Sequence, residues 1–188
     1  MLLDASAFPP CYFYSLLTIL ILMQYVRIPE ERVNVLIGEG GKTKRLLESR
    51  MKCKIKVEGN EVSVEGEPYA EWIGKDLVQA IGRGFNPEKA LSLLQENSGF
   101  VLIDLDDFAT TSKSIQTRRG RVIGEDGRTR KFIERTTGAF ISVYGDTVGI
   151  LGSFDSVEIA KKAVLMLVSG SNHSTVYRYL EKNRGKTE

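Results

Sequence analysis

The sequence has little with which to perform metal or nucleophilic chemistry. Its 188 residues include one histidine, His173, and two cysteines, Cys11 and Cys53. One histidine and two cysteines cannot complete a four-ligand zinc site, and two cysteines cannot build a disulfide-rich domain. We therefore expect no metal site, no cofactor and no histidine-dependent catalysis, in a protein of the reducing cytoplasm.

The sequence also lacks low-complexity tracts and, with one exception, long apolar runs. Hydrophobic residues make up 42% of the chain and charged residues 27%, which is typical of a folded globular protein. The exception is residues 11–26, CYFYSLLTILILMQYV. This run is shorter than the roughly 20 residues of a membrane-spanning helix, and it has neither a basic leader nor a cleavage site.

Three interpretations of this run stay open. It is a signal anchor, a helix packed on the domain or a partner, or the product of an upstream start codon. We favour the last, because the segment that follows Met23 reads as an edge strand. We therefore treat residues 1–22 as an extension, whose presence in the natural protein is open, and expect no membrane attachment.

Net charge gives little information, but its distribution gives more. The formal charge is +2. Residues 42–56 carry seven basic and one acidic side chain, and residues 113–135 carry eight basic and three acidic ones. Two separate basic segments in a nearly neutral chain indicate two local sites for an anionic partner.

The chain repeats itself at an offset of 86 residues. Residues 38–67 align without a gap with residues 124–153, and ten of the 30 positions are identical. We therefore predict two copies of one unit, module 1 (residues 23–99) and module 2 (residues 100–188, with a last helix and a short tail).

Both modules show the same order of expected elements. In module 1, strands are expected at 26–28, 53–57 and 61–65, and helices at 30–37, 42–51, from 68 to about 82, and from 87 to about 95. In module 2, strands are expected at 100–105, 139–144 and 147–151, and helices ending at 123 and spanning 128–137, 156–168 and 174–182. We expect Leu46 and Trp72 to face the core of module 1. The fold class is α+β, with a three-stranded antiparallel sheet packed on helices in each module.

A Gly-x-x-Gly turn joins two helices in each module, at residues 38–41 and 124–127. Glycine allows a positive φ and lets another backbone approach closely. The first N–H groups of the following helix favour an anion, so a phosphodiester could lie against the turn. One such turn is weak evidence, but two in the same context, each with isoleucine before it and a basic helix after it, favour nucleic-acid binding.

The surroundings of the turns supply further candidate contacts. Basic side chains after each turn can reach phosphates, and arginines before the second turn can do the same. Isoleucines beside each turn can form an apolar groove for unstacked bases. The candidate RNA-binding residues are Ile37, Gly38, Glu39, Gly40, Gly41, Lys42, Lys44, Arg45, Ile55, Arg118, Arg119, Arg121, Ile123, Gly124, Glu125, Asp126, Gly127, Arg128, Arg130, Lys131 and Ile141.

An enzymatic interpretation is disfavoured. The segment Gly41-Lys42-Thr43 looks like the end of a phosphate-binding P-loop, but that motif needs glycine five positions earlier, where Leu36 stands. A nuclease or phosphorylase would need a catalytic domain, and the two modules leave no sequence for one. The alternatives to a non-enzymatic RNA-binding assembly factor are a protein–protein adaptor, a translation-linked RNA chaperone and a membrane-tethered RNA adaptor.

The modules resemble the type I KH RNA-binding domain through the segments IGEGGKTKRLLE and IGEDGRTRKFIE. The whole chain from residue 24 to about 183 resembles the archaeal two-KH ribosomal RNA-processing proteins of the Dim2, or partner-of-Nob-one, family. That likeness is carried by AIGRGFNPEKALSLL, ILGSFDSVEIAKKAV and VYRYL. The acidic Glu39, Glu125 and Asp126 depart from the usual loop, and their charges repel phosphate.

The resemblance implies a function and partners. It implies a non-enzymatic protein of small-subunit ribosome biogenesis that binds single-stranded ribosomal RNA near the 16S 3′ end through its Gly-x-x-Gly loops. It also implies contact with the Nob-one endonuclease and with the alpha subunit of translation initiation factor two. We expect the more basic module 2 to be the main RNA site.

Overall fold

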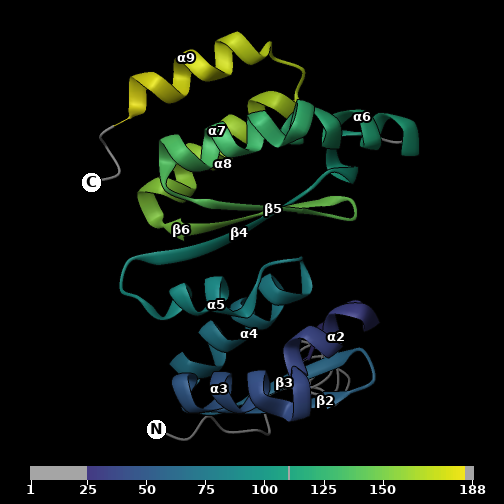
Figure 1. Ribbon diagram of the computed structural model, residues 1–188, viewed down its shortest axis with the longest axis vertical. Coiled ribbons are helices and arrows are strands. Elements are labelled where there is room, and N and C mark those ends of the chain that lie inside the picture. The colour runs from purple at the N-terminus through teal and green to yellow at the C-terminus, as the bar shows by residue number, and fades with distance from the viewer. Residues whose placement is uncertain (1–24, 110, 185–188) are drawn as a thin grey trace, which may run out of the picture.

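The computed structural model describes residues 25–109 and 111–184. Two α/β units are stacked along the long axis of the molecule, and the N-terminal unit forms the lower half of Figure 1. Residues 1–22, which we treated as an extension, lie outside the described residues. Within the described ranges, no helix combines the length and the apolar character needed to cross a membrane.

Module 1 contains a small antiparallel sheet in the order β1-β3-β2. A turn at Gly59 and Asn60 joins β2 to β3, and Pro68 stands in the first turn of the long helix α4, where its missing N–H costs nothing. Its elements are β1 (Tyr25–Arg27), α2 (Glu30–Ile37), η2 (Glu39–Gly41), α3 (Lys42–Met51), β2 (Lys54–Glu58), β3 (Glu61–Glu65), α4 (Pro68–Gly82), α5 (Pro87–Ala90) and η3 (Leu91–Leu94).

Module 2 repeats this arrangement with longer strands, in the order β4-β6-β5. Thr111 and Ser114 form a reciprocal capping box at the start of α6, and the Ser153 hydroxyl caps α8. Its elements are β4 (Ser98–Asp104), η4 (Asp106–Phe108), α6 (Ser112–Ile123), η5 (Glu125–Gly127), α7 (Arg128–Thr137), β5 (Phe140–Tyr144), β6 (Thr147–Ser153), α8 (Phe154–Val168) and α9 (His173–Asn183).

The sequence repeat is a structural repeat. The bounds of η2 and η5, α3 and α7, β2 and β5, and α4 and α8 differ by the same 86 residues. The predicted fold class, α+β with two three-stranded antiparallel sheets packed on helices, is confirmed. The last helix differs most between the modules, since α9 has 11 residues and α5 has only four.

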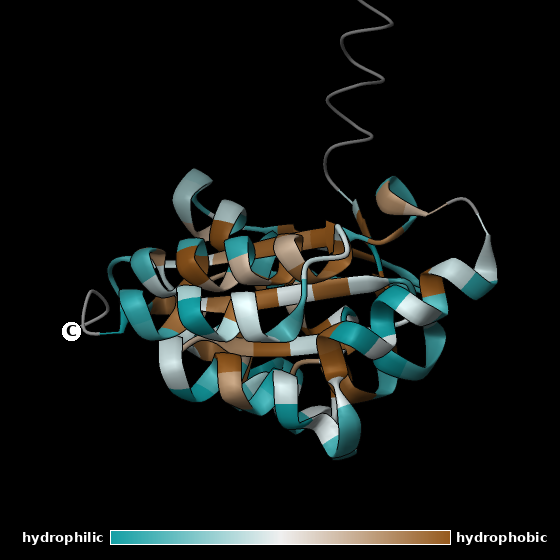
Figure 2. Cartoon of the chain, turned by 90° about the horizontal axis from the view of Figure 1, so that it is seen from above, coloured by the Kyte–Doolittle hydropathy of each residue, from teal (hydrophilic) through white to brown (hydrophobic). Residues whose placement is uncertain are grey.

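Each module has its own apolar core between sheet and helices. Leu36, Leu47 and Leu77 are fully buried in module 1, as are Ile133 and Leu167 in module 2. Figure 2 shows the apolar colouring along the strands and the inward helix faces, with polar residues outside.

Two residues expected in the core lie at the surface instead. Trp72 is 62% exposed, because nine residues at 100° each place it on the opposite side of α4 from buried Ile81. Leu46 is 43% exposed, because α3 buries the face that carries Leu47 and Met51. Its counterpart in module 2, Phe132, is covered by Tyr177 of α9, and the short α5 offers no such cover.

The modules are packed against each other through apolar and polar side-chain contacts. Phe85, just after α4, lies edge-on to Phe100 of β4 with ring centroids 6.1 Å apart. The Ser142 hydroxyl donates a hydrogen bond to the Arg83 carbonyl at 2.8 Å. Leu151 of β6 is buried in the core cluster of module 1. In Figure 1, α5 lies directly beneath the sheet of module 2.

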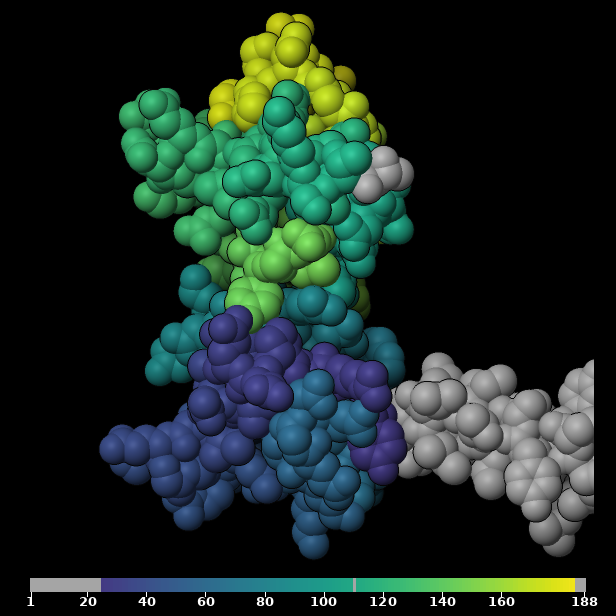
Figure 3. All heavy atoms as spheres, turned by 90° about the vertical axis from the view of Figure 1, so that its right-hand side faces the viewer, coloured from purple at the N-terminus to yellow at the C-terminus, as the bar shows by residue number. Residues whose placement is uncertain are grey.

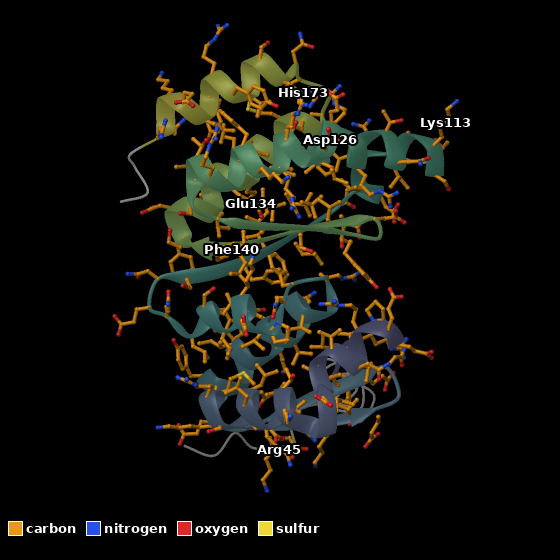
Figure 4. All side chains as sticks on the ribbon, viewed as in Figure 1. Arg45, Lys113, Asp126, Glu134, Phe140 and His173 are labelled. Atoms are coloured by element: carbon orange, nitrogen blue, oxygen red, sulfur yellow. The ribbon has the colours of Figure 1, made fainter. Side chains whose placement is uncertain are left out.

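Polar contacts close the same interface. The Lys89 ammonium lies 4.6 Å from the ring centroid of Phe140. The Tyr144 hydroxyl donates a hydrogen bond to the Glu31 carboxylate, and this contact raises the pKa of the phenol above its usual value. Figure 4 labels Phe140 on the side of its sheet that faces module 1.

Candidate nucleic-acid interface

The two Gly-x-x-Gly turns have the same backbone conformation. Gly38 has φ 71° and ψ 175°, and Gly124 has φ 73° and ψ 174°. The last glycines, Gly41 and Gly127, are left-handed, with φ of 77° and 73°. The third position of the second turn is Asp126, which adopts φ 52° although it is not glycine. Short aspartate tolerates this region better than most residues, so both sequences reach one loop shape.

The first and last glycines of each turn serve different purposes. A Cβ on Gly38 would lie 2.1 Å from Thr43 Oγ1, and one on Gly124 would lie 2.2 Å from Thr129 Oγ1. The first glycine is therefore required by packing inside the protein. At Gly41 a Cβ would meet nothing within 4 Å, so the surface there is open to the backbone of a ligand.

The helix that follows each turn begins with a cation that is already near an acid. Lys42 lies 3.8 Å from Glu39, and Arg128 lies 3.6 Å from Glu125. All four side chains are exposed, so these pairs contribute little stability. A phosphate can therefore replace the carboxylate as partner of Lys42 or Arg128, at the cost of repulsion from the displaced acid.

A second cation in each module fastens the turn itself. Arg45 donates a hydrogen bond to the Gly40 carbonyl at 2.7 Å, and Lys131, its counterpart, lies 3.5 Å from the Asp126 carbonyl. Both side chains stay at the surface, where Figure 4 shows Arg45 on the outside of module 1. They hold the loop in shape and keep positive charge beside it.

On its sheet side, each basic helix is tied to the edge strand by glutamate. Glu48 Oε1 accepts a hydrogen bond from the Ile55 N–H at 2.9 Å, and Glu134 Oε1 accepts one from the Ile141 N–H at the same distance. Lys44 lies 4.0 Å from Glu48. The equivalent Arg130 lies 3.8 Å from Glu134, which Figure 4 labels between α7 and the sheet. These contacts fix the position of each basic helix relative to its edge strand.

Two of the four isoleucines expected to form an apolar groove beside the turns are buried instead. Ile55 and Ile141, whose side chains we expected beside unstacked bases, are 1% and 3% exposed and belong to the cores. Alternation along an edge strand points these side chains inward, so the strand can offer a ligand only its backbone and its outward residues. Ile37 and Ile123, at the ends of α2 and α6, are half-buried and remain accessible.

The three arginines before the second turn do not act as one group. Arg121 Nε donates to the Leu167 carbonyl at 2.9 Å, and its Nη2 donates to the Ser171 carbonyl. Arg32 of α2 binds the equivalent carbonyls of Ile81 and Phe85. Arg121 therefore secures the end of α8, where the helix dipole favours a cation, and we remove it from the candidate phosphate contacts. Arg118 and Arg119 stay half-exposed candidates.

Sequence reasoning missed a surface that α9 builds on module 2. Tyr177 packs on Phe132 with ring centroids 4.5 Å apart, and its hydroxyl lies 3.1 Å from Thr129 Oγ1. Together with Arg128, Lys131 and Arg135, these rings line a shallow hollow of about 460 Å³. The helical spacing of the three cations was visible in the sequence, but the packing of Tyr177 against them was not.

Two titratable groups of module 1, Cys53 and Lys56, have raised pKa values. Cys53 is buried, and burial, with a smaller contribution from the charge of Glu48, raises the pKa of its thiol. The Lys56 ammonium bonds to Glu65 at 2.5 Å, and this hydrogen bond raises the pKa of Lys56. Both groups keep their protons at neutral pH, so neither supplies a nucleophile or base.

The two turns lie on the same side of the molecule. In Figure 3, the blue segment around residues 40–45 and the green segment around residues 125–135 both project at the left-hand edge. Because the modules are packed together, one strand of nucleic acid could contact both turns. That arrangement, two units with the same order of elements and a Gly-x-x-Gly turn in each, defines the class of protein: a tandem KH protein.

Comparisons with known proteins agree with this class. Residues 23–80 match the KH domain model, and residues 99–185 match the model of the eukaryotic type KH domain, type I. The KH domain-containing protein MJ0443 of Methanocaldococcus jannaschii is 42% identical over 170 residues, which are 87% of this chain and 75% of that protein. The pre-rRNA-processing protein PNO1 of Chaetomium thermophilum is 27% identical over 82% of this chain and 63% of its own length.

Solved structures show the same relationship. The crystal structure of Dim2p from Pyrococcus horikoshii OT3 superposes with a TM-score of 0.79 at 45% identity, covering 85% of this chain and 98% of that one. The a/eIF2alpha–aDim2p–rRNA complex from the same organism gives 0.80 at 44% identity, over 87% and 94%. The chain belongs to the two-KH-domain family of archaeal Dim2p and eukaryotic PNO1.

Proposed function

We propose that this protein is a non-enzymatic factor of small-subunit ribosome biogenesis that binds single-stranded ribosomal RNA near the 16S 3′ end. Its modules act as two domains, with the predicted bounds 23–99 and 100–188, although β4 of module 2 begins two residues before that boundary, at Ser98. The protein works in the cytoplasm. One observation carries the proposal: two turns of the same conformation, each followed by a basic helix, lie on the same side of two modules that are packed together.

The proposed RNA-binding residues are the two turns as a whole and the cations beside them, with the last glycine of each turn and the cations nearest the phosphates. They comprise Gly38, Glu39, Gly40, Gly41, Lys42, Lys44 and Arg45 in module 1, and Arg118, Arg119, Gly124, Glu125, Asp126, Gly127, Arg128, Arg130 and Lys131 in module 2. The half-buried Ile37 and Ile123 contribute apolar contact to bases.

The relatives support the choice of RNA and of protein partners. A Dim2p relative has been crystallised with ribosomal RNA and the alpha subunit of initiation factor two, and PNO1 relatives are named as pre-rRNA-processing proteins. We propose the same two partners for this chain. Contact with the Nob-one endonuclease is proposed from the family resemblance.

The test is a titration of a single-stranded oligonucleotide of the 16S rRNA 3′ end into the protein. Gly127→Asp is compared with Gly127→Asn, because both side chains tolerate a left-handed φ but only aspartate adds charge. Loss of a charge-assisted contact of about 1.5–3 kcal/mol predicts affinity reduced about tenfold or more by Asp and less by Asn.

The same pair at Gly41 tests module 1. If Gly127→Asp weakens binding more than Gly41→Asp, module 2 is the main site. If neither aspartate weakens binding beyond its asparagine control, the turns are structural and the protein is an adaptor for other proteins.

A further inference from the structure

A hollow lies at the seam between the modules, away from the turns and their basic helices. It measures about 330 Å³ and is lined by residues of both modules, including Tyr69, Trp72 and Asp76 of α4, Phe100 of β4 and Phe154 of α8. Its lining includes residues of the segment between η3 and β4. That segment is found at the left of Figure 1. None of the candidate RNA-binding residues lines it.

The hollow gathers large apolar side chains that the fold leaves in water. Among the described residues, six large hydrophobic side chains are exposed, and Tyr69 (72%), Trp72 (62%) and Phe154 (55%) all line this hollow. A fourth, Leu94, lies between the lining residues Leu93 and Gln95. A cluster of exposed aromatic rings in a small protein marks a surface for a partner.

The charge inside the hollow is negative. Asp76 is the one charged side chain among its lining residues, and it lies one helical turn from Trp72 on the same face of α4. The carboxyl is about half buried, and burial, with no charged or hydrogen-bonding partner contributing, raises its pKa. A half-buried carboxylate beside aromatic rings suits a cation with a flat, weakly hydrated head and an apolar stem.

We propose that the seam hollow binds an arginine-bearing segment of a protein partner. The guanidinium meets the Asp76 carboxylate, and the side-chain stem and its apolar neighbours cover Trp72 and Phe154. RNA is disfavoured here because the carboxylate repels phosphate and no lining cation offsets it. Because residues of both modules line the hollow, the partner binds only when the modules are packed together. The surface of the hollow is separate from the RNA site.

Trp72 is the single tryptophan of the chain, so its fluorescence reports on this site alone. The probe is the capped peptide Gly-Leu-Arg-Leu-Gly, titrated into the full chain. Its control is the same peptide with neutral citrulline in place of arginine. We expect a saturable fluorescence change with the arginine peptide and about tenfold weaker binding of the citrulline peptide, because the charge-assisted hydrogen bond is lost. Equal binding of both, or no saturable change up to about 10 mM, overturns the proposal.

Variants test whether the peptide binds in the hollow. The affinity of a labelled arginine peptide for each variant is measured by fluorescence anisotropy. Asp76→Asn and Trp72→Ala are expected to weaken binding about tenfold, while Asp155→Asn, an exposed acid next to Phe154, leaves it unchanged. Circular dichroism verifies that each variant is folded.

The RNA site supplies the independent control. Gly127→Asp is expected to leave peptide binding unchanged, so a failure of this proposal is separate from a failure of RNA binding. If instead the rRNA oligonucleotide changes Trp72 fluorescence and Asp76→Asn tightens RNA binding, the hollow is part of the RNA path and the proposal is wrong.

Discussion

Replacing the first glycine of either turn by alanine is expected to destabilise the protein far more than replacing the last. At Gly124 the added Cβ would lie 2.2 Å from Thr129 Oγ1, 2.7 Å from Thr129 Cβ and 2.8 Å from Thr129 N. The backbone atom cannot rotate away, so trimming the threonine does not relieve the contact. The dihedrals, φ 73° and ψ 174°, also fall in a region that is essentially restricted to glycine.

The magnitudes follow from these two contributions. Backbone strain at Gly124 costs about 1–3 kcal/mol, and overpacking adds about 1–3 kcal/mol. Gly127→Ala meets only a side-chain carbon at 3.8 Å and adopts an ordinary left-handed conformation, which costs about 1–2 kcal/mol. We therefore expect Gly124→Ala to lower the free energy of unfolding by about 2 kcal/mol more than Gly127→Ala.

Urea denaturation followed by circular dichroism measures this difference, with Gly38→Ala and Gly41→Ala as the equivalent pair in module 1. Thr129→Ala combined with Gly124→Ala is the decisive variant, because the clash with Thr129 N remains. Equal losses for Gly124→Ala and Gly127→Ala, or full recovery in the double variant, would refute the division of roles between the two glycines.

Three further predictions test the cations and the seam. Arg128→Ala is expected to reduce the slope of log K against log salt for the single-stranded oligonucleotide by about 0.7, and an unchanged slope would remove Arg128 from the phosphate contacts. Arg121→Met is expected to cost about 2 kcal/mol of unfolding free energy and to leave RNA affinity nearly unchanged, whereas Arg119→Met, with one contact at 3.4 Å, costs less than about 0.5 kcal/mol. Burial raises the pKa of Asp76 in the folded protein, so the ionised carboxyl lowers the free energy of unfolding once the pH exceeds that pKa. Asp76→Asn should therefore stabilise the protein at pH 7, but not at a pH below about 3.9, the pKa of aspartate in an unfolded chain. Urea denaturation at both pH values tests this last prediction. If Asp76→Asn raises the free energy of unfolding at both pH values, the cause is packing and not the charge of Asp76.

The internal repeat made most of the fold predictable. Alternation of apolar and basic residues indicated β2, and a continuous apolar run indicated β4. Glycine and proline indicated the turns and the start of α4 at Pro68. The repeat then transferred each element from one copy to the other, which explains why the bounds of α3 and α7 were both correct. The split of the expected helix 87–95 into α5 and η3 was not predictable, because Leu93 packs into the core of module 1 and the chain turns toward β4.

The candidate site was less predictable, because side-chain direction depends on tertiary packing. The turns and their cations could be identified from local sequence. The hydrogen bonds of Arg121 could not be predicted, since its partners Leu167 and Ser171 are more than 45 residues away in the sequence. The position of Trp72 was equally unpredictable. Helical periodicity identifies the buried face of α4, but it does not show that Trp72 lies beside Phe154 of the other module.

The most direct test of the central claim is to locate a bound RNA on the protein. A 16S rRNA 3′-end oligonucleotide with 4-thiouridine at successive positions is photo-crosslinked to the full chain, and the crosslinked peptides are identified by mass spectrometry. The account predicts crosslinks in residues 37–45 and 123–131 from one oligonucleotide, and their loss in Gly41→Asp and Gly127→Asp respectively. Crosslinks that avoid both turns, or that survive both substitutions, would contradict it.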